Sequence, residues 1–166
     1  MYIIRIKFDR LRDVRITDLI EAVGVYVIWD GRAKSRPSYI GEGRILRRFS
    51  EHANRFAKPF DGYIGILGDD STRTTKQEAE IVEALLIHVA EEVDRAPSAN
   101  KAPGKFTGLT RIFRSHGHLR IRVSGYDPLS IPGQTRRLST SKVIELKLTD
   151  YGVLVNHTWR KRRKQR

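Results

Sequence analysis

Two tyrosine-containing tripeptides and the basic segment behind them are the residues of this chain best suited to chemistry. Gly24-Val25-Tyr26 is followed, twelve residues later, by Tyr39-Ile40-Gly41. Residues 23–29 are mostly β-branched or aromatic, and turn-forming glycine and proline separate them from the second tripeptide, so this spacing predicts a β-hairpin. Because alternate side chains of a strand share a face, we expect Tyr26 and Tyr39 to lie on paired strands within reach of each other.

The segment after the second tripeptide predicts an amphipathic helix over residues 44–58. Its apolar residues recur at intervals of three and four, which is typical of a helix with one buried stripe. Cationic side chains follow the opposite face at intervals of four, four and three: Arg44, Arg48, His52 and Arg55. Side chains with this spacing stack along one side of a helix, and such a row suits a phosphate group.

A second predicted helix carries an acid in an apolar setting. After a predicted strand over residues 60–67, a Thr75-x-x-Glu78 capping box indicates the start of this helix. Glu83 projects from a mostly apolar part of its surface, where a carboxylate is costly unless it is paired or binds a cation. Asn100 follows in a Pro-x-x-Asn motif, although asparagine after a helix is also a common turn residue.

In their order and spacing, these features resemble the GIY-YIG nuclease family, whose name describes the two tripeptides, here with Val25 in place of the isoleucine. The resemblance covers about residues 22–103. It implies a metal-dependent endonuclease that hydrolyses phosphodiester bonds in DNA, with one Mg²⁺ or Mn²⁺ ion in each active site. A standalone enzyme of the restriction or mobile-element type fits better than a repair subunit, because the chain already carries a basic extension.

The resemblance also implies roles for a charged pair. Arg48 takes the place of the catalytic arginine. One residue fewer than in several family members separates it from Gly41, so Arg44 and Arg47 stay as alternatives. Glu83 takes the place of the metal-binding glutamate, and Glu80 is its alternative.

Four further residues complete the expected active site: Tyr26, Tyr39, His52 and Asn100. By resemblance, Tyr26 is the general base or its relay, Tyr39 positions water or phosphate, and His52 is an assisting base. Asn100 would orient a phosphate or order the active-site loop. A tyrosine accepts a proton near neutral pH only if cations lower its pKa from about 10, and we expect the basic helix and the metal to supply that field.

The expected fold is α+β, with a small antiparallel sheet of three or more strands flanked by helices in β-β-α-β-α order. Residues 1–21 are expected to form an N-terminal strand and helix appendage, and residues 22–103 the catalytic module. Residues 104–158 are expected to form a basic β-rich extension, because apolar and charged residues alternate in two of its segments. Residues 159–166 are expected to form a disordered basic tail.

Positive charge is concentrated in the C-terminal part of the chain. The formal net charge is +13, and residues 101–166 hold 16 basic and 3 acidic side chains. Such a surface attracts a phosphate backbone, and we expect duplex DNA as the partner. The expected DNA-contacting residues outside the catalytic set are Arg44, Arg47, Arg55, Arg111, Arg114, Arg120, Arg122, Arg136, Arg137, Arg160, Lys161, Arg162 and Arg163.

Composition excludes several other classes. The chain has no cysteine, so disulfides and thiolate metal sites are absent. Charges throughout the first twenty residues argue against a secretory signal, and no apolar run is long enough to cross a membrane, so we expect a cytoplasmic protein without a membrane partner. A non-catalytic DNA-binding protein such as a repressor, a structure-specific repair nuclease and an RNA-associated protein stay as alternatives. Cutting both strands with one site would favour a homodimer on DNA or sequential nicking.

Overall fold

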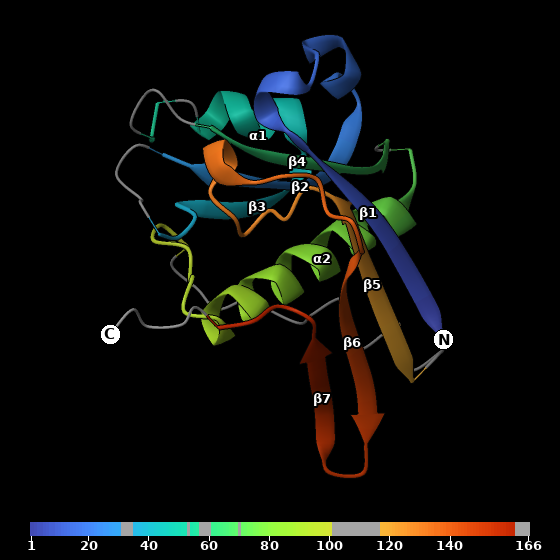
Figure 1. The fold of residues 1–166 in the computed structure, drawn as a ribbon. Helices are drawn as coiled ribbons and strands as arrows, with labels where there is room; N and C mark the ends of the chain where they lie inside the picture. The colour runs from blue at the N-terminus through green and yellow to red at the C-terminus, as the bar shows by residue number, and fades with distance from the viewer. Residues whose placement is uncertain (31–34, 53, 57–60, 70, 101–116, 162–166) are drawn as a thin grey trace, which may run out of the picture.

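The computed structural model describes residues 1–30, 35–52, 54–56, 61–69, 71–100 and 117–161. Seven strands form one sheet in the order β3-β2-β4-β1-β5-β6-β7 (Figure 1). The strands are β1 (Tyr2–Arg10), β2 (Ala22–Trp29), β3 (Tyr39–Arg44), β4 (Asp61–Asp69), β5 (His118–Gly125), β6 (Lys142–Thr149) and β7 (Gly152–His157). The α-helices are α1 (Ile45–His52) and α2 (Arg73–Glu92), and 3₁₀ turns span Leu11–Asp13, Ile16–Leu19 and Pro132–Gln134.

The fold is α+β, as expected, and the order β2-β3-α1-β4-α2 agrees with the expected β-β-α-β-α core. The sheet is larger than this core because β1 lies near its centre. β1 pairs antiparallel with β4 and parallel with β5. The N-terminal and C-terminal segments therefore extend the sheet of the hairpin, and the single parallel pair makes the sheet mixed.

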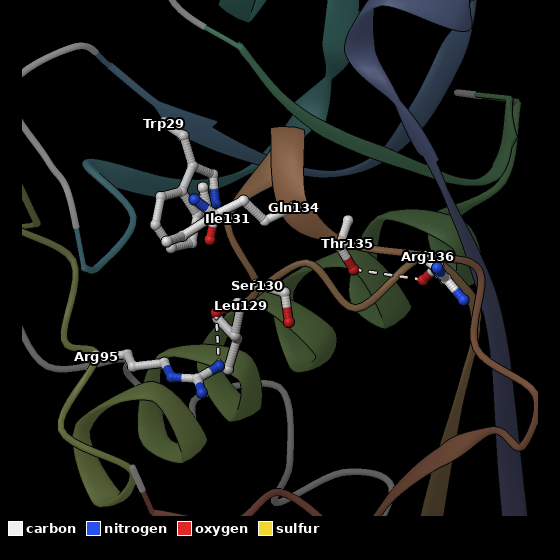
Figure 2. A pocket seen from close by; sticks show the side chains of 8 residues that line it. All are labelled: Trp29, Arg95, Leu129, Ser130, Ile131, Gln134, Thr135 and Arg136. Carbon is white, nitrogen blue, oxygen red and sulfur yellow. Dashed lines mark hydrogen bonds between the residues drawn. The ribbon is translucent and has the colours of Figure 1, made fainter. Parts of the chain in front are cut away.

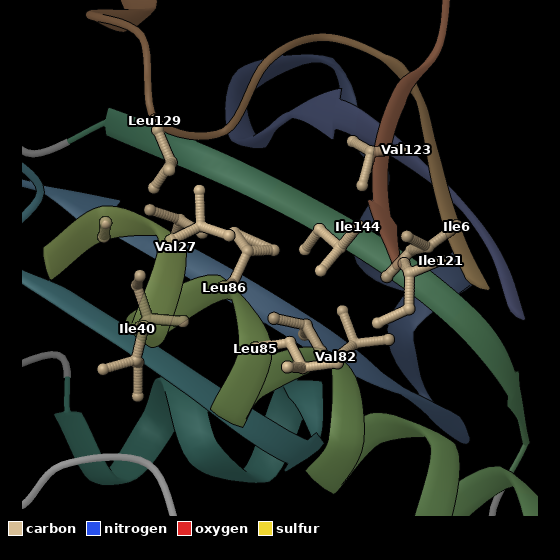
Figure 3. Packing of buried hydrophobic residues seen from close by; sticks show 14 of the residues in the cluster. Ile6, Val27, Ile40, Val82, Leu85, Leu86, Ile121, Val123, Leu129 and Ile144 are labelled. Atoms are coloured by element: carbon tan, nitrogen blue, oxygen red, sulfur yellow. The ribbon is translucent and has the colours of Figure 1, made fainter. Parts of the chain in front are cut away.

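Helices cover both faces of the sheet around β2, and this explains why every residue of β2 is buried. Val25 and Val27 face α2 and belong to the larger core cluster, whereas Tyr26 and Ile28 face α1 in the smaller one. A strand that is covered on both faces reads as a continuous apolar run rather than an alternating one. Figure 3 shows the larger cluster, in which Leu85 and other α2 side chains pack against the strands.

The start of α2 differs from the expected capping box. Thr72 is the N-cap, and its hydroxyl accepts a hydrogen bond from the Thr75 backbone N–H over 3.2 Å. Thr75 is already helical, and Glu78 accepts a hydrogen bond from the Tyr2 hydroxyl instead of closing a box. The prediction was wrong because Thr72 offers a better-placed cap one turn earlier. Similarly, α1 ends at His52, before the predicted end at residue 58.

The C-terminal segment forms the expected strands and turn, with Thr149 paired to Gly152 at the end of the β6–β7 hairpin. The loop after β5 crosses the end of β2, where Trp29 Nε1 donates to the Pro128 carbonyl over 3.2 Å. The Tyr63 hydroxyl donates to the Ser130 carbonyl over 2.6 Å, so this loop is anchored from two strands. Among the described residues, no helix combines the length and apolar character needed to cross a membrane.

Candidate active site

The hairpin of β2 and β3 brings the two tyrosines together at the sheet edge. Tyr26 lies opposite Gly41, and Tyr39 lies opposite Ile28. The tyrosine ring centroids are 6.0 Å apart, and the two phenol groups influence each other's pKa. A Cβ atom at Gly41 would lie 2.5 Å from Cζ of Tyr26 and 2.6 Å from Cε1 of Tyr39. Glycine is therefore required here because the two rings meet above its backbone.

Helix α1 places a cation and an imidazole beside this pair. The side chain of Arg48 lies over Gly43, with Nε 3.4 Å from the position a Cβ would take there. The buried ring of His52 is 5.0 Å from that of Tyr39 and 6.2 Å from that of Tyr26, measured between centroids. Burial raises the pKa of both tyrosines, and the positive charge of Arg48 opposes this shift in each. The charge of Arg48 in α1 therefore acts on a tyrosine of each hairpin strand, β2 and β3.

Helix α2 contributes Glu83, whose carboxyl group is held in an unfavourable setting. Burial, followed by the negative charges of Glu42 and Glu80, raises the pKa of Glu83 to about 7, and Arg48 opposes this shift. The charge of Glu83 in turn raises the pKa of Tyr39. The acid that interrupted the apolar pattern of α2 therefore belongs to the same electrostatic cluster as the tyrosines and the arginine.

Asn100 acts on the backbone of the edge strand. Its Oδ1 accepts from the Ile40 N–H over 3.0 Å, and its Nδ2 donates to the Ile40 carbonyl over 2.9 Å. The neighbouring Ala99 N–H donates to the Ser38 carbonyl over 2.8 Å. Because Ile40 lies between Tyr39 and Gly41, Asn100 is a positioning residue that holds the second tripeptide in place.

The protein's own charges do not lower the tyrosine pKa values overall. Burial is the largest influence on Tyr26 and Tyr39 and raises the pKa of each, outweighing the opposite effect of Arg48. The charges of the basic helix alone therefore do not bring a tyrosine pKa toward neutrality, and the expected lowering by the helix and a metal together stays a prediction. Desolvation is the stronger effect because the phenol of Tyr26 is enclosed by the sheet and α1.

The imidazole of His52 lies in a setting that disfavours its protonated form. Burial, followed by the charges of Arg55 and Arg48, lowers its pKa below the ordinary value of 6.5. Arg55 Nη1 lies 3.3 Å from Nδ1 of His52. Because arginine is always a donor, this contact makes Nδ1 the acceptor and leaves the imidazole proton on Nε2.

Sequence reasoning missed Glu42 and Lys76. Burial and then Glu80 raise the pKa of Glu42. A pocket of about 530 Å³ opens beside it, lined by Val23, Glu42, Gly43, Arg44, Arg47, Arg48, Lys76 and Glu80. The signal in the sequence was the position of Glu42 next to the second tripeptide. Because side chains alternate along β3, Glu42 lies on the opposite face of the strand from Tyr39 and Gly41. The prediction had considered only the face that carries the tyrosines.

The other expected cationic residues are spread over several elements. Arg44 and Arg47 line this pocket, and Arg47 also pairs with Glu51. Arg120 forms an ion pair with Glu145, whereas Arg122 is exposed on β5. Arg136 and Arg137 lie on the loop before β6, and Arg160 and Lys161 follow β7. Arg111, Arg114, Arg162 and Arg163 lie outside the described residues.

Few of the described side chains around the edge strand β3 could bind a divalent cation, and Glu83 is one that suits it. Within the described residues, no group of three or more histidine, aspartate or glutamate side chains is arranged to hold a metal ion. Glu83 is nevertheless a hard oxygen donor whose ionised form is disfavoured by burial and by two neighbouring carboxylates. A cation beside it would remove that penalty, so the residues fit one ion held by Glu83 with water and phosphate as further ligands.

Comparison with models of protein families, with curated proteins and with solved structures found no match for this chain.

Proposed function

We propose that this protein is a metal-dependent endonuclease that hydrolyses phosphodiester bonds in duplex DNA through a GIY-YIG-type active site. The observation that carries the proposal is the meeting of side chains from β2, β3, α1 and α2 around the edge strand β3. These side chains are Tyr26, Tyr39, Arg48, His52 and Glu83. Their residue types supply positive charge, a proton path and a cation ligand within one cluster.

Phosphodiester hydrolysis needs the charge of the phosphate to be neutralised as the attacking oxygen approaches. Arg48 is the cation for this role, since its charge already acts on the tyrosine pair and on Glu83. Arg44, Arg47 and Lys76 line the adjoining pocket and would hold the flanking phosphates. Glu83 would hold a Mg²⁺ or Mn²⁺ ion, which supplies further positive charge against the scissile phosphate when bound.

The tyrosine pair fits a proton relay better than a phenolate base. Because the pKa of Tyr26 is raised, its hydroxyl stays protonated at neutral pH. A protonated phenol still passes a proton on, since its oxygen accepts one as its own proton moves to a hydrogen-bonded neighbour. Tyr39 would be that neighbour, since its ring centroid lies 6.0 Å from that of Tyr26, and the His52 ring lies next to Tyr39 with a centroid distance of 5.0 Å.

An open face of the sheet supports duplex DNA as the substrate. On β1, Ile4, Ile6 and Phe8 point into the core, so Arg5 and Lys7 point to solvent and are exposed. Arg5 lies directly opposite Arg122 of β5, and like charges facing each other across strands are unfavourable without an anion. Lys7 is paired with Asp9 on the same face over 3.7 Å, so Arg5 and Arg122 are the cations of this face that we assign to the phosphates of a duplex.

Plasmid cleavage tests the proposal. Supercoiled plasmid is incubated at low salt with wild-type protein, with Glu83→Gln and with Glu91→Gln, each in Mg²⁺ or in EDTA. Glu91 lies on the same helix and is exposed, so its variant controls for the lost charge. Nicking or linearisation by the wild type and Glu91→Gln in Mg²⁺, absent in EDTA and in Glu83→Gln, would support the nuclease. Cleavage by Glu83→Gln, or binding without strand breakage on plain and branched duplexes, would refute it.

A further inference from the structure

A second pocket lies away from β3, where the loop after β5 passes the ends of β2 and α2. It has a volume of about 270 Å³ and is lined by Trp29, Arg95, Leu129, Ser130, Ile131, Gln134, Thr135 and Arg136 (Figure 2). Its lining contains two arginines, an amide and two hydroxyls, and it contains no carboxylate. The lining therefore offers hydrogen-bond donors and positive charge to a ligand.

The C-terminus of α2 fixes the position of Arg95. The Arg95 N–H donates to the Ala90 carbonyl over 2.7 Å, and the Asp94 N–H donates to the Glu91 carbonyl over 3.3 Å. These two bonds make a Schellman motif, and Asp94 has the left-handed conformation that the motif requires, with φ of 60°. The helix end thus directs Arg95 toward the loop independently of any ligand.

The guanidinium group of Arg95 is held in place but is not satisfied. Its Nη1 donates to the Leu129 carbonyl over 2.7 Å, as the dashed line in Figure 2 shows. Its Nε is buried and has no hydrogen-bond partner among the described residues. No ion pair with Arg95 occurs in the described part of the chain either. A guanidinium has five N–H groups, so Arg95 keeps donors beyond its bond to Leu129, and the one on Nε is shielded from water.

The same loop is fastened from its other end by a second arginine. Arg10 Nη2 donates to the Thr135 carbonyl over 2.8 Å, and its Nε is also buried without a partner in the part of the chain that is described. The nearby Asp127 does not serve the pocket, because its oxygens accept from Leu129, Ser130 and Trp159. Positive charge around the loop therefore exceeds the negative charge available to it.

We propose that this pocket binds a phosphate group. A phosphate has several acceptor oxygens and matches the planar donor fork of arginine. Arg95 is fixed before the ligand arrives, and the exposed Arg136 adds positive charge to the lining. The pocket is larger than one phosphate needs, which leaves room for an attached sugar. This site lies apart from the proposed catalytic cluster, and its occupancy does not depend on cleavage or on a metal.

Calorimetric titration of the full chain in EDTA tests the site. The probes are inorganic phosphate, a single-stranded trinucleotide with a 5′-phosphate and the same trinucleotide without it. We expect Arg95→Met and Arg136→Met each to weaken binding about ten-fold, the loss expected for a charged hydrogen bond. Arg15→Met, which removes an equal charge from an exposed position elsewhere, should change binding less than about two-fold on the same scale. Arg136 is exposed, so its variant keeps the test valid if Arg95→Met does not fold.

The three probes separate the sources of the phosphate. Binding of inorganic phosphate and the phosphorylated trinucleotide alone would assign a terminal phosphate, whereas binding of both trinucleotides would assign the internal backbone. Failure of all three probes to bind would overturn the proposal, as would equal weakening by Arg15→Met. Glu91→Gln, at an exposed position outside both sites, should bind phosphate as the wild type does. Because the titration is carried out in EDTA and measures binding alone, a failed cleavage assay and a failed phosphate site are told apart.

Discussion

Replacing Glu83 by glutamine should stabilise the protein at alkaline pH. The pKa of Glu83 is raised from its ordinary 4.5 to about 7 in the folded protein, so the folded state binds a proton more tightly than the unfolded state. The stability gained from the protonated carboxyl is complete below pH 4.5 and is lost as pH rises through about 7. A difference of about 2.5 pKa units corresponds to about 3 kcal/mol of unfolding free energy at pH 8, as an upper value.

Urea unfolding in EDTA at pH 5 and pH 8 measures this effect in wild type, Glu83→Gln and Glu91→Gln. At pH 8 we expect Glu83→Gln to exceed the wild type by about 2 to 3 kcal/mol, and at pH 5 by less than about 1 kcal/mol. Glu91→Gln should follow the wild type at both pH values. Mg²⁺ at pH 8 should stabilise the wild type more than Glu83→Gln. A Glu83→Gln variant less stable than the wild type at pH 8 would show that the carboxylate has adequate partners and would refute the reasoning.

Three further changes have expected outcomes. Gly41→Ala should cost about 2 kcal/mol or more in urea unfolding, because its Cβ would overlap both tyrosine rings; Gly133→Ala, which meets nothing within 4 Å, should be nearly neutral, and equal effects would contradict this. Asn100→Ala should speed amide exchange on β3 and lower cleavage, since two backbone bonds are lost; unchanged exchange would count against a positioning role. Arg122→Gln should reduce the salt slope of duplex binding by about 0.9 per lost phosphate contact, whereas a slope equal to that of Arg15→Gln would remove the open face from the DNA-binding surface.

Local sequence patterns predicted the elements of the fold better than their assembly. The hairpin, both helices and the β6–β7 turn each have a period or a turn signal within a short window. The place of β1 has no such signal, because residues 2–8 alternate in the same way whichever strand they join. Its parallel partner β5 begins more than 100 residues later. The pairing of β1 with β5 depends on the core that both strands share beneath α2. No short stretch of sequence contains the residues of that core.

The residues of the candidate site likewise differ in how far local sequence patterns could predict them. Tyr26, Tyr39, Arg48 and Glu83 could be proposed from the sequence because each has a recognisable place within its own element. Glu42 was missed because its effect arises from two elements, β3 and α2, whose carboxylates approach each other. The effect of burial on the tyrosine pKa values was missed for a related reason. Nearby charges were visible in the sequence, whereas the extent of burial depends on how α1 packs on the sheet.

The cost of Glu83 bears on the choice between an enzyme and a non-catalytic DNA-binding protein. A carboxylate buried beside two others lowers stability at neutral and alkaline pH. DNA binding gives no reason to keep it, since a negative charge near the phosphates repels the ligand. A binding protein would gain both stability and affinity from glutamine at this position. In an enzyme that needs a cation against the phosphate, the carboxylate would bind that cation, and this function would offset the stability that the buried carboxylate costs. The unfolding experiment therefore tests Glu83 for its effect on stability, and the plasmid experiment tests it for its effect on cleavage. Only the enzyme proposal requires Glu83→Gln to be more stable than the wild type and also to have lost a cleavage activity.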